Sequence, residues 1–266
     1  MNKKQMVLLC VSSLAANAVF ANNGDQMVGL SGISSAMSGA VVAMPQDSST
    51  LLSNPAGLAF LDLGETDTRF DMNVSILNPN RSLNDVESDS SVYVLATGGF
   101  AFKSDMWGKD LTVGIGANPV SGGGVDFPNS AFSMAPASQA IVATRTSMRI
   151  GPSVAYQPAD NWSVGGNLSL TSNAMSLRRP TSAGGNFPMD VAYGYAFGFG
   201  TVYKPGKRVQ LGAAYTSQSY SEDLEWNMDD GKYTLEFDDP QTVALGASFQ
   251  ATPALQIEVD VKWFEY

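Results

Sequence analysis

Histidine is absent from this chain of 266 residues, and cysteine occurs once, at Cys10. Without histidine the chain cannot form the Ser-His or Cys-His pairs that activate nucleophiles, and it lacks the commonest metal ligand. The G-x-S-x-G, P-loop and G-x-G-x-x-G motifs are missing as well. The sequence therefore makes no positive case for an enzyme, and we expect neither a metal nor a cofactor.

Basic residues are scarce. Lysine and arginine number 15 against 25 aspartate and glutamate residues, which gives a formal net charge of -10. Phosphate backbones and anionic lipid headgroups repel a chain of this charge. We therefore expect no nucleic acid among its partners.

Residues 1–21 have the features of a secretory signal peptide. Lys3 and Lys4 precede an apolar stretch, Met6–Leu14, and Val19–Ala21 offers a small-x-small cleavage site. A membrane anchor helix is the alternative, but this apolar run is shorter than the roughly 20 residues that cross a bilayer. We predict export and cleavage, after which the mature chain has no cysteine and no disulfide.

Long apolar runs are also lacking beyond residue 21, so a mature membrane protein would have to cross with β-strands. Residues 22–65 are instead rich in glycine, alanine, serine and methionine. An apolar stretch at Ile33–Met44 and the N-capping residue types at Asp47–Ser49 predict one or two short helices. The apolar content is too high for a solvated leader, so we expect a buried position.

Beyond residue 66 the hydrophobic period becomes two. The clearest case is Leu255–Trp263, where apolar residues alternate with Gln256, Glu258, Asp260 and Lys262. Such alternation places one face of a strand in an apolar medium and the other in a polar one. The predicted strands cover about 68–76, 92–102, 111–118, 148–156, 162–170, 193–199, 209–215, 232–250 and 255–263.

A transmembrane barrel accounts for these strands better than a soluble sandwich. Aromatic residues such as Trp162 and Tyr203 stand at strand ends, as in the aromatic girdles of outer-membrane barrels. Small residues alternate along Gly194–Gly200, as expected for a face that lines a lumen. Short turns at 158–161, 204–206 and 251–253 alternate with longer predicted connections at 78–91, 120–144, 172–189 and 219–231.

The predicted fold class is therefore all-β, a transmembrane antiparallel β-barrel formed by residues 66–266, with residues 22–65 as a helical plug. Nine strands result if Lys232–Gln250 is one strand kinked at Asp238–Pro240, and ten if it is two. Bacterial single-chain barrels usually have an even number of strands. Either the long strand divides, or the chain stops before the barrel closes.

Acidic residues gather in one predicted outer loop. Carboxylate pairs can hydrolyse glycosides or bind Ca²⁺. No further motif supports either chemistry, and we interpret the cluster as a solvated loop surface. Its members are Glu222, Asp223, Glu225, Asp229 and Asp230.

The region before the first strand carries a specific series of residues. Small residues around Gly29, Gly32 and Gly39 are followed by Asp47, and then by the sequence Asn54, Pro55, Ala56. In this context the series resembles the N-terminal hatch of the FadL/OmpP1/TodX family of outer-membrane long-chain fatty acid and hydrocarbon transporters. Later segments resemble successive strands of that family, namely Gly151–Tyr156, Tyr195–Tyr203, Leu235–Phe249 and Val261–Trp263.

The resemblance implies a monomer in the bacterial outer membrane with a fourteen-stranded barrel and a hatch at 22–65, so that this chain would end about five strands early. It also implies that fatty acids or hydrocarbons enter the lumen and leave sideways into the lipid. The exit would be a kink in the third strand, against which Asn54, Pro55 and Ala56 pack.

The third predicted strand has a weak point of this kind. It runs into Pro119, which cannot donate to the ladder, and then into Gly122, Gly123 and Gly124, which weaken a strand. The alternative is that a loop begins at these glycines. Two other functions stay open: a general porin for small polar solutes, and a surface structural protein or receptor without transport.

Overall fold

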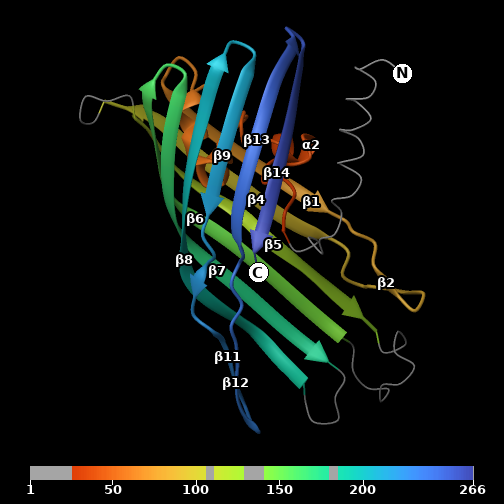
Figure 1. Cartoon of the computed structure of the whole chain (residues 1–266). Coiled ribbons are helices and arrows are strands. Elements are labelled where there is room, and N and C mark those ends of the chain that lie inside the picture. The colour runs from red at the N-terminus through yellow and green to blue at the C-terminus, as the bar shows by residue number, and fades with distance from the viewer. Residues whose placement is uncertain (1–25, 106–110, 129–140, 180–184, 266) are drawn as a thin grey trace.

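The computed structural model describes residues 26–105, 111–128, 141–179 and 185–265; the predicted signal peptide, residues 1–21, lies outside these ranges. Nine antiparallel strands follow one another in chain order and form one curled sheet (Figure 1). They are β1 (Thr68–Leu77), β4 (Tyr93–Ser104), β5 (Leu111–Phe127), β6 (Ile141–Ala159), β7 (Trp162–Arg179), β8 (Gly185–Gly206), β9 (Val209–Thr216), β13 (Gln241–Thr252) and β14 (Leu255–Glu265).

The period-two pattern of the sequence separates the two faces of the sheet. In β1 the side chains of Phe70, Met72 and Ile76 are exposed, Phe70 to 68 % of its surface, whereas Asp71 contacts the N-terminal part of the chain. An outward apolar face and an inward polar face are what a strand needs when hydrocarbon surrounds it. The predicted positions of eight of the nine strands are confirmed, although several strands are longer than predicted.

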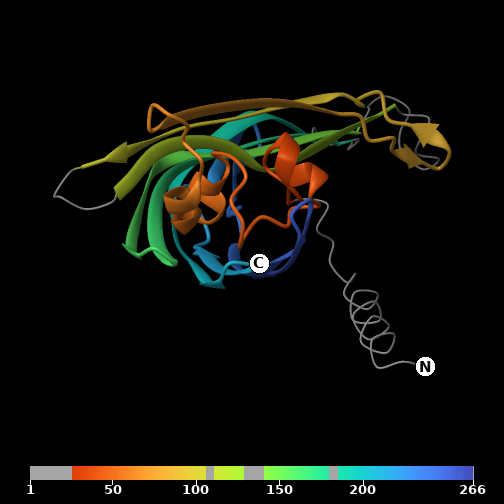
Figure 2. The ribbon, with the colours of Figure 1, turned by 90° about the horizontal axis from the view of Figure 1, so that it is seen from above.

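The N-terminal segment, residues 26–66, lies on the concave side of the curled sheet (Figure 2). It contains α2 (Gly32–Ala36), α3 (Thr50–Ser53) and the 3₁₀ helix η1 (Pro55–Phe60). Ser31 caps α2 by accepting a 3.1 Å hydrogen bond from the Ser34 backbone N–H. Pro55 occupies the first position of η1, where its missing N–H costs nothing.

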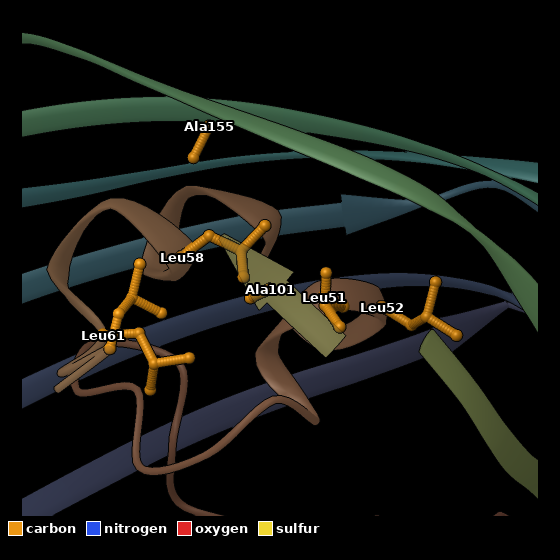
Figure 3. Packing of buried hydrophobic residues seen from close by; sticks show 7 residues of the cluster. Leu51, Leu52, Leu58, Leu61, Ala101 and Ala155 are labelled. Atoms are coloured by element: carbon orange, nitrogen blue, oxygen red, sulfur yellow. The ribbon is translucent and has the colours of Figure 1, made fainter. Parts of the chain in front are cut away.

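Leucine side chains hold this segment against the sheet. Leu51 and Leu58 are fully buried, and they cluster with Ala101 of β4 (Figure 3). Burial of each leucine contributes roughly 1.5–3 kcal/mol. The core of the described chain thus lies between the N-terminal segment and the sheet, and includes Leu51, Leu52, Leu58, Leu61, Leu63, Ala101 and Ala155.

Helix extent in the N-terminal segment differs from the prediction. The stretch Ile33–Met44 is helical only as far as Ala36, and residues 40–44 are irregular because β14 side chains bind their backbone. Ser49 precedes α3 but makes no side-chain cap. Instead the Ser49 backbone N–H donates to Asp47 Oδ1 at 3.0 Å.

Two predicted long connections, 120–144 and 172–189, are shorter than predicted, because the neighbouring strands extend into both of them. β5 continues to Phe127 and β6 begins at Ile141, while β7 continues to Arg179 and β8 begins at Gly185. Glycine and polar residues suggested loops there, but ladder hydrogen bonds use the backbone and tolerate such side chains on a lumen face. Residues 129–140 and 180–184 lie outside the described ranges.

The predicted long strand Lys232–Gln250 is two strands. β12 (Gly231–Leu235) pairs with β11 (Leu224–Met228) apart from the main sheet, and β13 starts only at Gln241. The remaining short strands are β2 (Ser82–Leu83), β3 (Val86–Glu87) and β10 (Tyr220–Ser221), which pairs with β8. Among the described residues β1 and β14 each pair with one neighbour, so the sheet is open.

Within the described ranges, no helix is long and apolar enough to cross a membrane.

Candidate functional site

A cavity of about 120 Å³ lies between the N-terminal segment and the sheet. An apolar cavity of about 150 Å³ in another protein stays dry and binds benzene. The present cavity therefore suits a small aromatic ring or a short length of alkyl chain. Its apolar lining consists of Met27, Val28, Leu30, Val41, Val42, Leu52, Val120, Ala214, Ala244 and Phe264.

One side of the cavity carries buried polar groups without partners. Asn118 of β5 and Arg149 of β6 are cross-strand neighbours, and both line the cavity. Asn118 is 1 % exposed, and neither its Oδ1 nor its Nδ2 has a hydrogen-bond partner among the described residues; Arg149 Nε has none either. A buried unpaired polar group costs about 1–3 kcal/mol. A bound molecule with a polar end could satisfy these groups.

A buried ion-pair cluster lies beside this polar side. Arg145, Ser147 and Arg149 alternate along β6 and so share its inward face. Asp239, between β12 and β13, is 0 % exposed and meets all three. Its Oδ1 lies 3.2 Å from Arg145 Nη2, and its Oδ2 lies 2.5 Å from Ser147 Oγ and 3.8 Å from Arg149 Nη2.

A second cavity, of about 300 Å³, adjoins the glycines of β5. Gly122, Gly123 and Gly124 line it together with Arg145 and Met175. Arg145 thus lines this second cavity and Arg149 lines the first, while Asp239 contacts both arginines. The ion-pair cluster therefore stands between the two cavities.

Side chains of β14 hold the irregular part of the N-terminal segment. Asp260 Oδ2 accepts hydrogen bonds from the backbone N–H groups of Val41 and Val42, at 2.9 and 3.0 Å. Glu258 Oε1 accepts from Ala43 and Met44, at 2.9 and 3.1 Å. Lys262 Nζ donates to the carbonyl of Gly39 at 2.7 Å. The polar face of β14 thus supplies hydrogen-bond partners for backbone groups of residues 39–44, which in a helix would bond to one another.

The sequence Asn54, Pro55, Ala56 packs against β7 and β8. Asn54 is fully buried, and its Nδ2 donates to the carbonyl of Val42 at 2.7 Å. The Ala56 carbonyl accepts from Ser163 Oγ of β7 at 2.9 Å. A Cβ atom added to Gly165 would lie 2.5 Å from the Ala56 nitrogen, so only glycine permits this close approach.

The predicted weak point of the third strand is a bulge rather than a break. β5 keeps its pairing with β6 through residues 119–124, with a register shift between Pro119 and Ser121. The alternative of a loop beginning at Gly122 is wrong, because Gly122, Gly123 and Gly124 all lie in the ladder.

The structure does not bring the sequence Asn54, Pro55, Ala56 to this bulge. Their described hydrogen bonds and closest approaches are to Val42, β7 and β8. The bulge is instead met by the start of the described chain, where the Met27 N–H donates to the Val120 carbonyl at 3.0 Å and Gln26 bridges Ser121. The sequence did not predict that residues 26 and 27 contact the bulge, because they carry no recognisable motif.

Of the inward charges, Glu258 and Asp260 stand on the polar face that the sequence predicts, and Arg149 has the corresponding position in the predicted strand 148–156. Arg145 lies before that predicted strand, so no alternating pattern marked it. The acidic loop residues include Glu225, whose Oε1 lies 2.7 Å from Lys232 Nζ, and Asp230, which accepts from Tyr233 Oη. In the part of the chain that the structure describes, no group of acidic side chains is arranged to hold a metal ion.

Comparisons with known proteins agree with this geometry. A family model described as "Outer membrane protein transport protein (OMPP1/FadL/TodX)" matches residues 8–266. The fold is similar to the toluene transporter TodX of P. putida, with a TM-score of 0.71, 19% identity, and coverage of 88% of this chain and 70% of that chain. It is also similar to the Ralstonia pickettii toluene transporter TbuX, with a TM-score of 0.75, 20% identity, and coverage of 88% and 71%.

A FadL homologue from Pseudomonas aeruginosa is similar as well, with a TM-score of 0.62, 13% identity, and coverage of 91% of this chain and 70% of that chain. At these identities the likeness establishes a common fold. Among proteins with curated descriptions, none matches the sequence significantly.

Proposed function

Because the chain belongs to the OMPP1/FadL/TodX family of outer membrane transport proteins, we propose that it carries hydrophobic small molecules passively across a bacterial outer membrane. The observation that supports this most is the apolar cavity between the N-terminal segment and the sheet. An apolar molecule gains roughly 0.8 kcal/mol per CH₂ on leaving water, so an apolar cavity is a better path for it than an aqueous channel.

In this proposal residues 22–65 are a hatch that fills the lumen. The leucine core, the β14 carboxylates and the glycines at 165 and 200 support that role, because each holds the segment tightly against the sheet. A filled lumen does not favour the alternative of a general porin for small polar solutes. A surface structural protein or receptor has no need of an internal cavity lined by apolar side chains.

The exit of the cargo is the bulge of β5. Val120 is the extra residue there and lines the cavity, so the wall is weakest where the cavity reaches it. Pro119 has no N–H to close the ladder, and the Gln26–Met27 backbone covers the bulge from inside. Displacement of Gln26 and Met27 would open the cavity sideways toward lipid.

Uptake of labelled toluene and of a labelled long-chain fatty acid tests this function. We expect cells that express the protein to take up at least one of them faster than cells without it. If cells with and without the protein take up toluene at the same rate, and also the fatty acid at the same rate, hydrophobic transport is contradicted.

The exit has its own test in a deletion of Val120, which restores regular pairing between β5 and β6. We expect slower uptake with normal insertion in the membrane. The control is Val120→Ala, which keeps the bulge. If the deletion leaves uptake unchanged while the parent protein transports, the lateral exit is wrong and the transport function stands.

A further inference from the structure

Asp239 lies in the stretch between β12 and β13, where hydrogen bonds to Ser219, which follows β9, hold it in place. β9 ends at Thr216, and β13 begins at Gln241. Between them the Asp239 N–H donates to Ser219 Oγ at 2.6 Å, and the Asp239 carbonyl accepts from the Ser219 N–H at 3.0 Å. This backbone pairing fixes the Asp239 carboxylate so that it points at β6.

The carboxylate occupies the place that an anionic head group would need. Each of its oxygens faces one arginine, and Ser147 donates to it as well. The outer side of Arg145 is covered by Phe237, whose ring centroid lies 3.9 Å from the guanidinium carbon. Arginine with a carboxylate is a strong charge-assisted pair, which a second carboxylate would have to break.

Two charged side chains line the first cavity, Arg149 and Lys262, and each has negative groups close to it. Asp239 faces Arg149, and Lys262 shares the inward face of β14 with Glu258 and Asp260. Burying an additional charge in such a site is costly unless a partner is free for it. Two groups in the cavity wall have no hydrogen-bond partner among the described residues: the side-chain amide of Asn118, which is neutral, and Arg149 Nε, whose guanidinium charge is already opposed by Asp239.

We propose that Asp239 is the residue that sets charge selectivity, and that the preferred cargo is uncharged: a hydrocarbon, or an apolar molecule with a neutral polar end. Asp239 acts by holding Arg149 and Arg145, and so denies them to a carboxylate passing between the two cavities. This inference rests on the proposed function and narrows its substrate class, because it ranks neutral molecules above ionised fatty acids.

The test compares 1-decanol with decanoate, which match in chain length and differ in charge. Each displaces the uncharged fluorescent dye Nile red from the full chain in a non-ionic detergent at pH 8. We expect decanol to displace the dye from the parent protein at lower concentration than decanoate. In Asp239→Asn the decanoate concentration for half-displacement should fall about tenfold, as expected when an arginine gains a charged partner, and that for decanol should change less than about twofold.

The matched control is Asp238→Asn. Asp238 accepts from Ser219 Oγ and from the Ser221 N–H but contacts neither arginine, so this variant should keep the parent's preference. Adding Arg149→Gln to Asp239→Asn should remove the gain for decanoate, which separates a charge effect from a change of shape. Circular dichroism checks that the sheet content of each variant is that of the parent.

Three results would overturn the proposal. Decanoate could displace the dye from the parent better than decanol, or Asp239→Asn could change both ligands equally, which would make Asp239 merely structural. In both cases the cavity still binds hydrophobic molecules, and the proposed function survives. If neither ligand displaces the dye from any variant, the cavity is no ligand site, and the proposed function fails together with this inference.

Discussion

Asn54 lies directly against Gly200, so that a Cβ atom added to this glycine would be 1.9 Å from Asn54 Oδ1. The amide cannot retreat without losing its 2.7 Å hydrogen bond to the carbonyl of Val42. The position of the N-terminal segment therefore requires a residue without a side chain at position 200 of β8.

Replacing Gly200 with alanine should displace Asn54 and loosen the N-terminal segment. Overpacking of a buried site typically costs about 1–3 kcal/mol. We expect faster amide hydrogen exchange across residues 50–60, measured by mass spectrometry, with normal assembly of the sheet. Gly206→Ala is the matched control, because a Cβ atom there meets nothing within 4 Å.

Removing the Asn54 side chain should make room for a Cβ atom at position 200. In Asn54→Ala the hydrogen bond to Val42 is lost, so exchange rises and uptake changes, but the sheet assembles. Combined with Gly200→Ala, the two effects should be clearly less than additive, because residues in contact couple. Strict additivity in the double variant would show that Asn54 and Gly200 do not touch, and failure of Asn54→Ala to insert would show that the residue is needed for assembly.

The β14 carboxylates give a third prediction. Glu258→Gln combined with Asp260→Asn keeps the size of both side chains but turns four charge-assisted hydrogen bonds into neutral ones, which are roughly half as strong. Exchange should accelerate at the amides of residues 41–44 and stay unchanged across residues 50–60. Gln256→Glu, on the same face of the strand, provides a control that bonds none of these amides. Unchanged protection at 41–44 would mean that the carboxylates do not hold the segment.

Truncation of Leu51 tests the core. Leu51 is 0 % exposed and packs in the cluster with Leu52 and Ala101, so Leu51→Ala should lower the free energy of unfolding by about 2–5 kcal/mol. Urea unfolding in detergent, followed by tryptophan fluorescence, measures the change. Leu255, which is 52 % exposed on the outer face of β14, is the comparison, and its replacement by alanine should cost much less. Equal losses would argue against a core in this place.

The β11–β12 hairpin should depend on Trp226. This side chain is 6 % exposed, packs edge-on against Phe187 with ring centroids 5.4 Å apart, and donates through Nε1 to the Pro188 carbonyl at 2.7 Å. Trp226→Ala should detach the hairpin from β8 and speed its cleavage by a protease added outside, without slowing membrane insertion. Tyr220→Ala leaves the contact between Trp226 and Phe187 intact, so the protease should cleave this variant at the same rate as the parent protein.

Strand positions could be predicted because a strand in a barrel wall shows its two environments locally, in every second residue. The outward faces of Phe70–Ile76 and Ile257–Trp263 are examples. Strand lengths could not be predicted as well, because Gly122–Gly124 and Gly185 are held by neighbouring backbones rather than by their own side chains.

The partners of the inward polar residues escaped prediction for a different reason. Asp239 pairs with Ser147, 92 positions earlier in the chain, and Asn54 meets Thr201, 147 positions later. No local pattern encodes such a pairing, since only the curl of the sheet brings these residues together. The residue types were visible in the sequence, but their neighbours were not.

The hydrogen bonds from Val41 and Val42 to Asp260 span 219 and 218 positions of the chain. Contacts of such long range form late, because the intervening chain must be ordered before they can be made. The N-terminal segment is synthesised before β14 exists. Residues 41–44 must therefore wait, with their backbone N–H groups not yet bound by the β14 carboxylates, until that strand is in place, and during that interval they are open to wrong pairings.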